Sequence, residues 1–211
     1  MRKVFRKRFT RLCGSQGRTT MLQRFVGASR DRAAFVRTHV VFRPSDKIVD
    51  AGCGTGSALE FLPPVTYFGF DPNPDYIRLA QLRYGSRGQF LCGDASSLRV
   101  RELAQGADAF LSLGMLHHLT DTQIDQIFSL ARACLHPEGR FIFYEPCFST
   151  NDDLLGRVFM KLDRGGNIKT AQAWRALLLE HFATVDEYIR RPVYWFRYTT
   201  QAVICRGPRE L

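Results

Sequence analysis

The chain has 211 residues, of which 45% are hydrophobic and 24% charged, a length and composition that fit one globular domain with a sizeable core. No apolar stretch approaches the roughly 20 residues that span a bilayer, and the basic segment Met1–Phe9 lacks the apolar centre of a signal peptide. The six cysteines stand singly, without a Cys-x-x-Cys pair or a cluster with histidine, so we expect reduced thiols in a cytoplasmic protein and no metal site.

The net charge of +10 is concentrated near the N-terminus. Residues 1–43 contain twelve arginines and lysines against a single acid, Asp31, whereas the remaining residues together carry a net charge of −1. Residues 1–20, where Phe5 and Phe9 interrupt the basic residues, are predicted to form an arm. Its composition suits a cationic helix on an anionic membrane surface, a mitochondrial transit peptide, an RNA-binding arm or a solvated tail. The near-neutral remainder argues against a uniformly basic nucleic-acid interface.

After this arm, residues 21–211 are predicted to form one domain. Its first part, 21–43, shows apolar spacing close to 3.6 and is predicted to form two helices. Asp31 is expected to cap or begin the second of these helices, and Pro44 to end it.

From residue 47 onward, strand-like and helix-like runs alternate. The predicted strands lie near 47–51, 66–70, 89–92, 108–113, 140–144, 183–189 and 198–205. The predicted helices lie near 56–62, 74–84, 96–104, 121–135 and 171–182. Such alternation predicts an α/β fold whose parallel sheet is covered by helices on both faces. The last two strands follow each other directly and predict an antiparallel hairpin, and residues 146–170 are long enough to form a lid-like insertion.

The most informative motif is the run from Ile48 to Gly56, in which an apolar strand leads through Asp50 into Gly52, Gly54 and Gly56. The glycines favour a tight turn that a ligand can approach closely. A dinucleotide site has wider glycine spacing and places a pyrophosphate at this turn. The carboxylate of Asp50 would repel a phosphate but accept hydrogen bonds from an ammonium or hydroxyl group. The motif therefore predicts a nucleoside ligand without phosphates.

Three further strand ends carry polar or turn residues. In an open parallel sheet these ends lie on one edge, where ligands bind. The second strand ends at Asp71-Pro72, about twenty residues past the glycine turn, at the distance of a carboxylate that binds ribose hydroxyls. The third ends at Asp94-Ala95, where an acceptor and a backbone N–H suit an adenine ring, and the fourth ends at Leu113-Gly114.

In order and spacing, these four endings resemble the successive motifs of the class I S-adenosylmethionine-dependent methyltransferases. The resemblance is close over residues 31–145. It implies a seven-stranded, mostly parallel sheet with a C-terminal antiparallel hairpin and S-adenosyl-L-methionine as the cofactor. It also implies that the helices of residues 21–43 are cap helices that cover the cofactor and shape the substrate pocket. It also implies that the methionine end is held by Asp50, Gly52, Gly54 and Gly56, the ribose by Asp71 and the neighbouring Pro72, the adenine by Asp94 and Ala95, and the methionine amino group by a carbonyl of Leu113 or Gly114.

The segment after the fourth strand bears on the methyl acceptor. It lacks the Asn/Asp-Pro-Pro-Tyr/Phe motif of nucleobase and amide methyltransferases, and its His117-His118 pair resembles the small-molecule group, including the quinone-biosynthesis and type 11 enzymes. Either histidine is a candidate general base, with His117 preferred, although a helix-capping or packing role is the alternative. Tyr144 and Glu145 are expected to touch substrate. Pro146-Cys147 follows the wrong strand for a cytosine-5 methyltransferase nucleophile.

The acceptor itself is less well defined. Arg164 and Lys169 would bind an anionic substrate group or stay solvated, and the aromatic residues 194–198 would pack at an edge or form a contact between copies. The sequence therefore predicts methyl transfer to a small-molecule or lipid- or glycan-linked acceptor in the cytoplasm, with residues 1–20 a possible contact to an anionic membrane. An RNA methyltransferase that uses the basic arm, and a non-catalytic partner subunit, are the alternatives. Nothing in the sequence indicates the oligomeric state.

Overall fold

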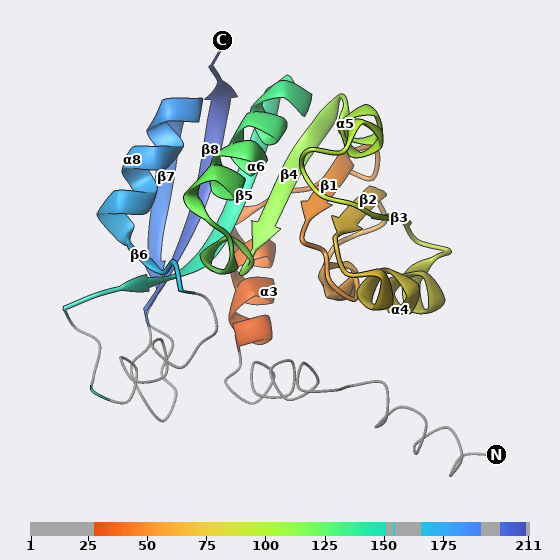
Figure 1. Cartoon of the computed structure of the whole chain (residues 1–211), viewed down its shortest axis with the longest axis horizontal. Helices are drawn as coiled ribbons and strands as arrows, with labels where there is room; N and C mark the ends of the chain where they lie inside the picture. The colour runs from red at the N-terminus through yellow and green to blue at the C-terminus, as the bar shows by residue number, and fades with distance from the viewer. Residues whose placement is uncertain (1–27, 151–153, 155–165, 191–198, 210–211) are drawn as a thin grey trace.

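The computed structural model describes residues 28–150, 154, 166–190 and 199–209, and Figure 1 traces their arrangement. The predicted arm 1–20, the predicted first cap helix after residue 21, Arg164 and the aromatic residues 194–198 lie outside the described residues, as does most of the predicted insertion. None of the described helices has the length and apolar character needed to cross a membrane.

Helices and strands follow one another much as predicted. The helical elements are α3 (Ala28–His39), the short 3₁₀ turn η1 (Ser57–Glu60), α4 (Pro74–Tyr84), α5 (Leu98–Ala104), the 3₁₀ turn η2 (Leu116–His118), α6 (Asp121–Cys134) and α8 (Ala171–His181). The strands are β1 (Lys47–Ala51), β2 (Thr66–Asp71), β3 (Gln89–Cys92), β4 (Ala107–Leu113), β5 (Leu135–Phe148), β6 (Lys169–Thr170), β7 (Phe182–Arg190) and β8 (Thr200–Pro208).

The main sheet has the strand order β3-β2-β1-β4-β5-β8-β7, and the two-residue β6 pairs with the end of β5. Strands β1 to β5 are mutually parallel, whereas β8 pairs antiparallel with both β5 and β7. The predicted α/β fold, with its mostly parallel sheet and C-terminal antiparallel pair, is confirmed. Among the strands of the described residues, only β6 was unforeseen, because two residues carry no periodic signal.

Alternating side chains of the sheet divide the core into two layers. Val49 and Phe141 face the layer that contains α5, α6 and α8. Ile48 and Ile142 face the opposite layer, which contains α3, η1 and α4. All four side chains are fully buried, which explains why these strands appear as continuous apolar runs in the sequence.

Helix α3 is attached to the sheet through Asp31, in a way that the sequence did not indicate. The helix already begins at Ala28, so the predicted capping role of Asp31 is wrong. Its carboxylate instead forms an ion pair of 2.6 Å with Arg190 of β7 and accepts a hydrogen bond of 2.5 Å from the hydroxyl of Tyr144 in β5. These contacts hold α3 near the carboxyl ends of β4 and β5, where Figure 1 shows it below the β4 arrowhead.

Candidate functional site

The glycine turn after β1 has the geometry that its sequence predicts. Gly52 has a φ of 65°, and a Cβ there would lie 2.4 Å from the side chain of Met115, so only glycine fits. Gly54 also has a positive φ, 54°, but no heavy atom lies within 4 Å of its Cβ direction. The turn is therefore packed beneath Gly52 and open above Gly54, which leaves room for a ligand.

Asp50, at the end of β1, is the main electrostatic feature of the site. Its side chain is buried, and its Oδ2 accepts a hydrogen bond of 2.6 Å from the hydroxyl of Tyr67 in β2. Burial raises the pKa of Asp50 to about 7, although the Tyr67 hydrogen bond and the positive charge of Arg32 act to lower it. A cationic partner would stabilise the ionised form of this buried carboxyl, and the ammonium group of a ligand is such a partner.

Asp71, at the end of β2, braces the glycine turn. One carboxylate oxygen accepts from the backbone N–H of Gly54 at 3.1 Å, and the other accepts from the N–H of Asn73 at 2.8 Å. Burial raises the pKa of Asp71 against these two hydrogen bonds. Each oxygen keeps a second lone pair for a hydroxyl of a ligand, and the following Pro72 is exposed.

The end of β3 adjoins Asp71, because the Gly93 N–H donates to the Asp71 backbone carbonyl at 3.1 Å. Asp94 is exposed, and its Oδ1 accepts from the N–H and the hydroxyl of Ser96 at 2.9 and 2.6 Å. These bonds lower the pKa of Asp94 and fix it as an anion. Ala95 is half-buried beside it. The predicted ribose and adenine residues therefore lie side by side.

The end of β4 contains a contact that the sequence did not reveal. The guanidinium of Arg32 in α3 donates to the backbone carbonyl of Leu113, the group expected to face the methionine amino group. Gly114 follows with a φ of 80°, and its N–H donates to the Tyr144 carbonyl at 2.6 Å. Arg32 thus lies between two groups predicted to bind the cofactor, Asp50 and Leu113, and helical periodicity alone could not distinguish it from the other arginines of the basic segment.

A pocket of about 340 Å³ joins these elements. Asp50, Gly52 and Leu113 contribute from the strand ends, Arg32 contributes from α3, and Phe61 follows η1. Of the residues predicted to bind the methionine end of the cofactor, the lining of this pocket thus includes Asp50, Gly52 and Leu113, whereas Gly54, Gly56 and Gly114 lie outside it. Asp71 and Asp94 are not part of this lining and lie at the ends of the neighbouring strands β2 and β3.

The two candidate histidines have different environments. His117 is buried, and its Nδ1 lies 2.5 Å from Oε2 of the fully buried Glu145. Glu145 also accepts from the backbone N–H groups of Met115 and Leu116, both at 2.8 Å. His118 is exposed, with its ring centroid 3.9 Å from that of His117. Glu145 therefore holds the turn after β4 in place.

The structure does not support the expectation that Tyr144 and Glu145 touch substrate, because both side chains are buried and hydrogen-bonded within the protein. Glu145 is 0% exposed and binds the His117 turn, and Tyr144 is 3% exposed and donates to Asp31. Their position at a strand end suggested access to substrate. The long β5 carries them beneath α3 and η2 instead.

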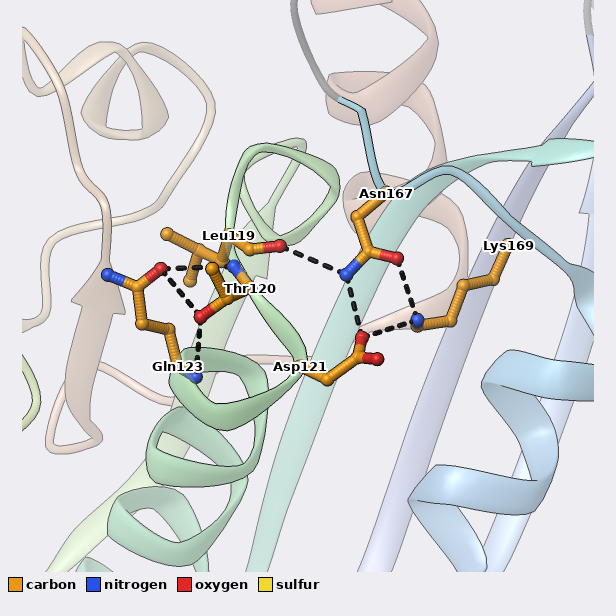
Figure 2. Close-up of polar contacts among 6 residues, drawn as sticks. All are labelled: Leu119, Thr120, Asp121, Gln123, Asn167 and Lys169. Atoms are coloured by element: carbon orange, nitrogen blue, oxygen red, sulfur yellow. Dashed lines mark hydrogen bonds and ion pairs between the residues drawn. The ribbon is translucent and has the colours of Figure 1, made fainter.

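A second polar cluster, drawn in Figure 2, fastens the start of α6 to the segment before α8. Asn167 donates through Nδ2 to the carbonyl of Leu119 at 3.0 Å and to Asp121 at 2.7 Å. Lys169 binds Asp121 at 2.7 Å and Asn167 at 2.8 Å. The hypothesis that Lys169 binds an anionic substrate group is therefore not supported, since its ammonium group has protein partners. Among the described residues, no group of three or more His, Cys, Asp or Glu side chains could hold a metal ion.

Comparison with known proteins agrees with this geometry. A family model described as "Methyltransferase domain" matches residues 48–139, which run from β1 into β5. The chain has the class I S-adenosylmethionine-dependent methyltransferase fold, and the match to the family model covers a little under half of its residues. Its matched part includes all four strand ends of the site.

Probable tRNA methyltransferase 9B of Bos taurus is 34% identical over 105 residues, which are 48% of this chain and 22% of that protein. The chain thus spans about a fifth of the length of the curated relatives it matches.

Solved structures share the fold at low identity. A SAM-dependent methyltransferase from Archaeoglobus fulgidus has a TM-score of 0.68 at 15% identity and covers 89% of this chain and 98% of its own. Haemonchus contortus phosphoethanolamine N-methyltransferase 2, solved with phosphomonomethylethanolamine and S-adenosylhomocysteine, has a TM-score of 0.66 at 14% identity and covers 85% of this chain and 53% of its own.

The residues of this site fit S-adenosylmethionine, the cofactor of the methyltransferases that share the fold. The buried Asp50 carboxylate lacks a cation at hydrogen-bond distance among the described residues, and its raised pKa shows the cost of that position. The space above Gly54 is open, and Asp71 borders it through the Gly54 N–H. Asp50, the glycine turn and Asp71 would therefore hold the cofactor's amino acid end and ribose.

Proposed function

We propose that this chain transfers the methyl group of S-adenosylmethionine to a small-molecule or lipid- or glycan-linked acceptor and releases S-adenosylhomocysteine. The observation that carries the proposal is the buried Asp50 carboxylate in the wall of a pocket formed by the glycine turn and α3. The cofactor, when bound, supplies an electrophilic methyl group on a sulfonium. The protein therefore has to bind and orient the cofactor and the acceptor and to exclude water, because the methyl group needs no further activation.

The chain's own residues support these tasks in distinct ways. Asp50 and the Leu113 carbonyl would orient the ammonium group, once Arg32 leaves that carbonyl. Asp71 would hold the ribose hydroxyls while its hydrogen bond to Gly54 fixes the glycine turn. Met115, packed against Gly52, would exclude water from the methionine end.

Where the acceptor must lose a proton, His118 is the better candidate for the general base. The sequence favoured His117, but that ring is buried and its Nδ1 is bound by Glu145, whereas His118 is exposed on the same turn. A general base has to reach the acceptor's proton directly or through one water molecule. His117 would then serve to position the turn.

An RNA acceptor is the second candidate. It is favoured by the curated relatives, which are named probable tRNA methyltransferases, and by the basic residues of segment 1–43. The sequence after β4 argues against a nucleobase acceptor. A non-catalytic partner subunit that only binds the cofactor remains the third.

Labelled cofactor distinguishes the three. Purified protein would be incubated with methyl-labelled S-adenosylmethionine and separate lipid, small-molecule and RNA fractions of a cell extract, with Asp50→Asn as the control. We expect label in the lipid or small-molecule fraction that the variant does not transfer. Label in RNA alone would establish the second candidate, and cofactor binding without label in any fraction would establish the third.

We further propose that the reaction takes place in the cytoplasm, with residues 1–20 as a contact to an anionic membrane. In support, Cys53, Cys92, Cys134 and Cys205 are free thiols, as is usual in a reducing compartment.

A further inference from the structure

One face of α3 carries two arginines toward the cofactor pocket. Arg30 and Arg37 are seven residues apart, which is close to two full turns, so their side chains leave the helix on the same side. Ala33 and Ala34 lie between them on that side, and all four residues line the pocket. The two small side chains leave a depression between two guanidinium groups roughly 10 Å apart along the helix.

Neither arginine has an acidic partner among the described residues. The pocket contains two acids, Asp50 and Glu60, and each is already bound by a tyrosine hydroxyl. Tyr67 donates to Asp50 at 2.6 Å, and Tyr84 donates to Glu60 at 2.8 Å. Arg30 and Arg37 are exposed and form no ion pair within the described part of the chain. Their charges are therefore available to a ligand.

Arg32 has a different position. It is half-buried, and its guanidinium is held by the Leu113 carbonyl next to Asp50. Arg32 is thus the pocket arginine that contacts a group predicted to bind the methionine end, whereas Arg30 and Arg37 line the same pocket without such a contact among the described residues. Guanidinium groups bind phosphate and carboxylate through paired hydrogen bonds, more strongly where part of the site is shielded from water.

We propose that Arg30 and Arg37 form an anion-binding subsite that takes a phosphate or carboxylate group of a small methyl acceptor. The inference rests on the proposed methyltransferase function and adds the chemical class of the acceptor. The pocket's volume of about 340 Å³ suits part of a small molecule. Such a subsite would favour acceptors with an anionic end over neutral ones.

The test uses inorganic pyrophosphate as the probe and the full chain loaded with S-adenosylhomocysteine. Calorimetric titrations at constant ionic strength would compare the wild type with Arg30→Gln, Arg37→Gln and the double variant. The control is Arg83→Gln, which removes one exposed arginine from α4, outside the pocket. We expect each single variant to bind pyrophosphate roughly tenfold more weakly, since one charge-assisted contact is lost, and the control to bind as the wild type does.

A second titration separates this subsite from the cofactor's own carboxylate. S-adenosylmethionine and its decarboxylated analogue would be titrated into the same proteins. Unchanged affinity for both in the arginine variants supports an acceptor subsite. If the variants bind S-adenosylmethionine more weakly but the analogue normally, the arginines hold the cofactor carboxylate and the proposal is wrong.

Two more outcomes overturn it. Wild-type protein that binds the cofactor but not pyrophosphate has no such subsite, while the proposed methyltransferase function stands. Wild-type protein that binds neither S-adenosylhomocysteine nor S-adenosylmethionine refutes the proposed function as well.

Discussion

Cofactor affinity should depend on pH through Asp50. Burial raises the pKa of this carboxyl to about 7, and only its ionised form attracts the ligand's ammonium group. Affinity should therefore fall as the pH falls through 7. With a pKa of 7 about half of the carboxyl is ionised at pH 7 and about a tenth at pH 6, so we expect roughly fivefold weaker binding at pH 6.

The assay is isothermal titration of S-adenosylhomocysteine at pH 6.0, 6.5 and 7.0. This window lies below the usual pKa of an α-amino group, roughly 7.7–8.0, so the ligand keeps its ammonium charge throughout. Asp50→Asn should bind more weakly and show no such slope. If the wild type binds equally well at pH 6 and pH 7, or if the Asn variant keeps the slope, Asp50 is not the group that recognises the ammonium.

Three further outcomes are expected. At pH 8 the ligand-free Asp50→Asn variant should melt at a higher temperature than the wild type, because ionising this buried carboxyl costs up to about 4 kcal/mol of folding stability. The stability that the protonated carboxyl provides is complete below about pH 4 and is lost as the pH rises through 7, so an equal gain at pH 4 would contradict this account. Asp71→Ala should weaken S-adenosylhomocysteine binding in calorimetry by roughly tenfold or more, since a charge-assisted contact to the ribose is lost; the exposed Asp75→Ala is the control, and equal affinity would refute the ribose assignment. Glu145→Gln should lower the free energy of unfolding in urea by about 2–4 kcal/mol, because the buried carboxylate binds His117 and the turn after β4, and wild-type stability would mean that this bracing is dispensable.

Much of the fold follows from local patterns. Buried strands with helices between them predict a parallel sheet, and the structure confirms the order of the predicted elements. Some element ends also follow from neighbouring residues. Asn73 accepts from the N–H of Asp75 at 3.0 Å and precedes Pro74, so α4 begins where the sequence predicts.

Element lengths were less well predicted, because they depend on neighbours in space. The predicted helix 56–62 is the four-residue η1, and β5 extends well beyond the predicted 140–144. Strand β5 pairs with β4 on one side and β8 on the other, and these partners lengthen it. No local pattern reports such pairing.

By itself, the sequence determined the strand ends and the residue types placed there. The glycines of a turn and the acids at the ends of buried strands are determined by a few neighbouring residues, so Asp50, Gly54 and Asp71 could be identified from their spacing in the sequence. The tertiary structure alone decided how these groups are used. Arg32 binds the Leu113 carbonyl across 81 residues of sequence, so its place in the site could not be predicted. Glu145 binds His117 across 28 residues, and this contact is part of the buried environment of His117. Burial and charge partners arise only when distant elements pack together, and they set the pKa of Asp50 and the accessibility of each candidate base.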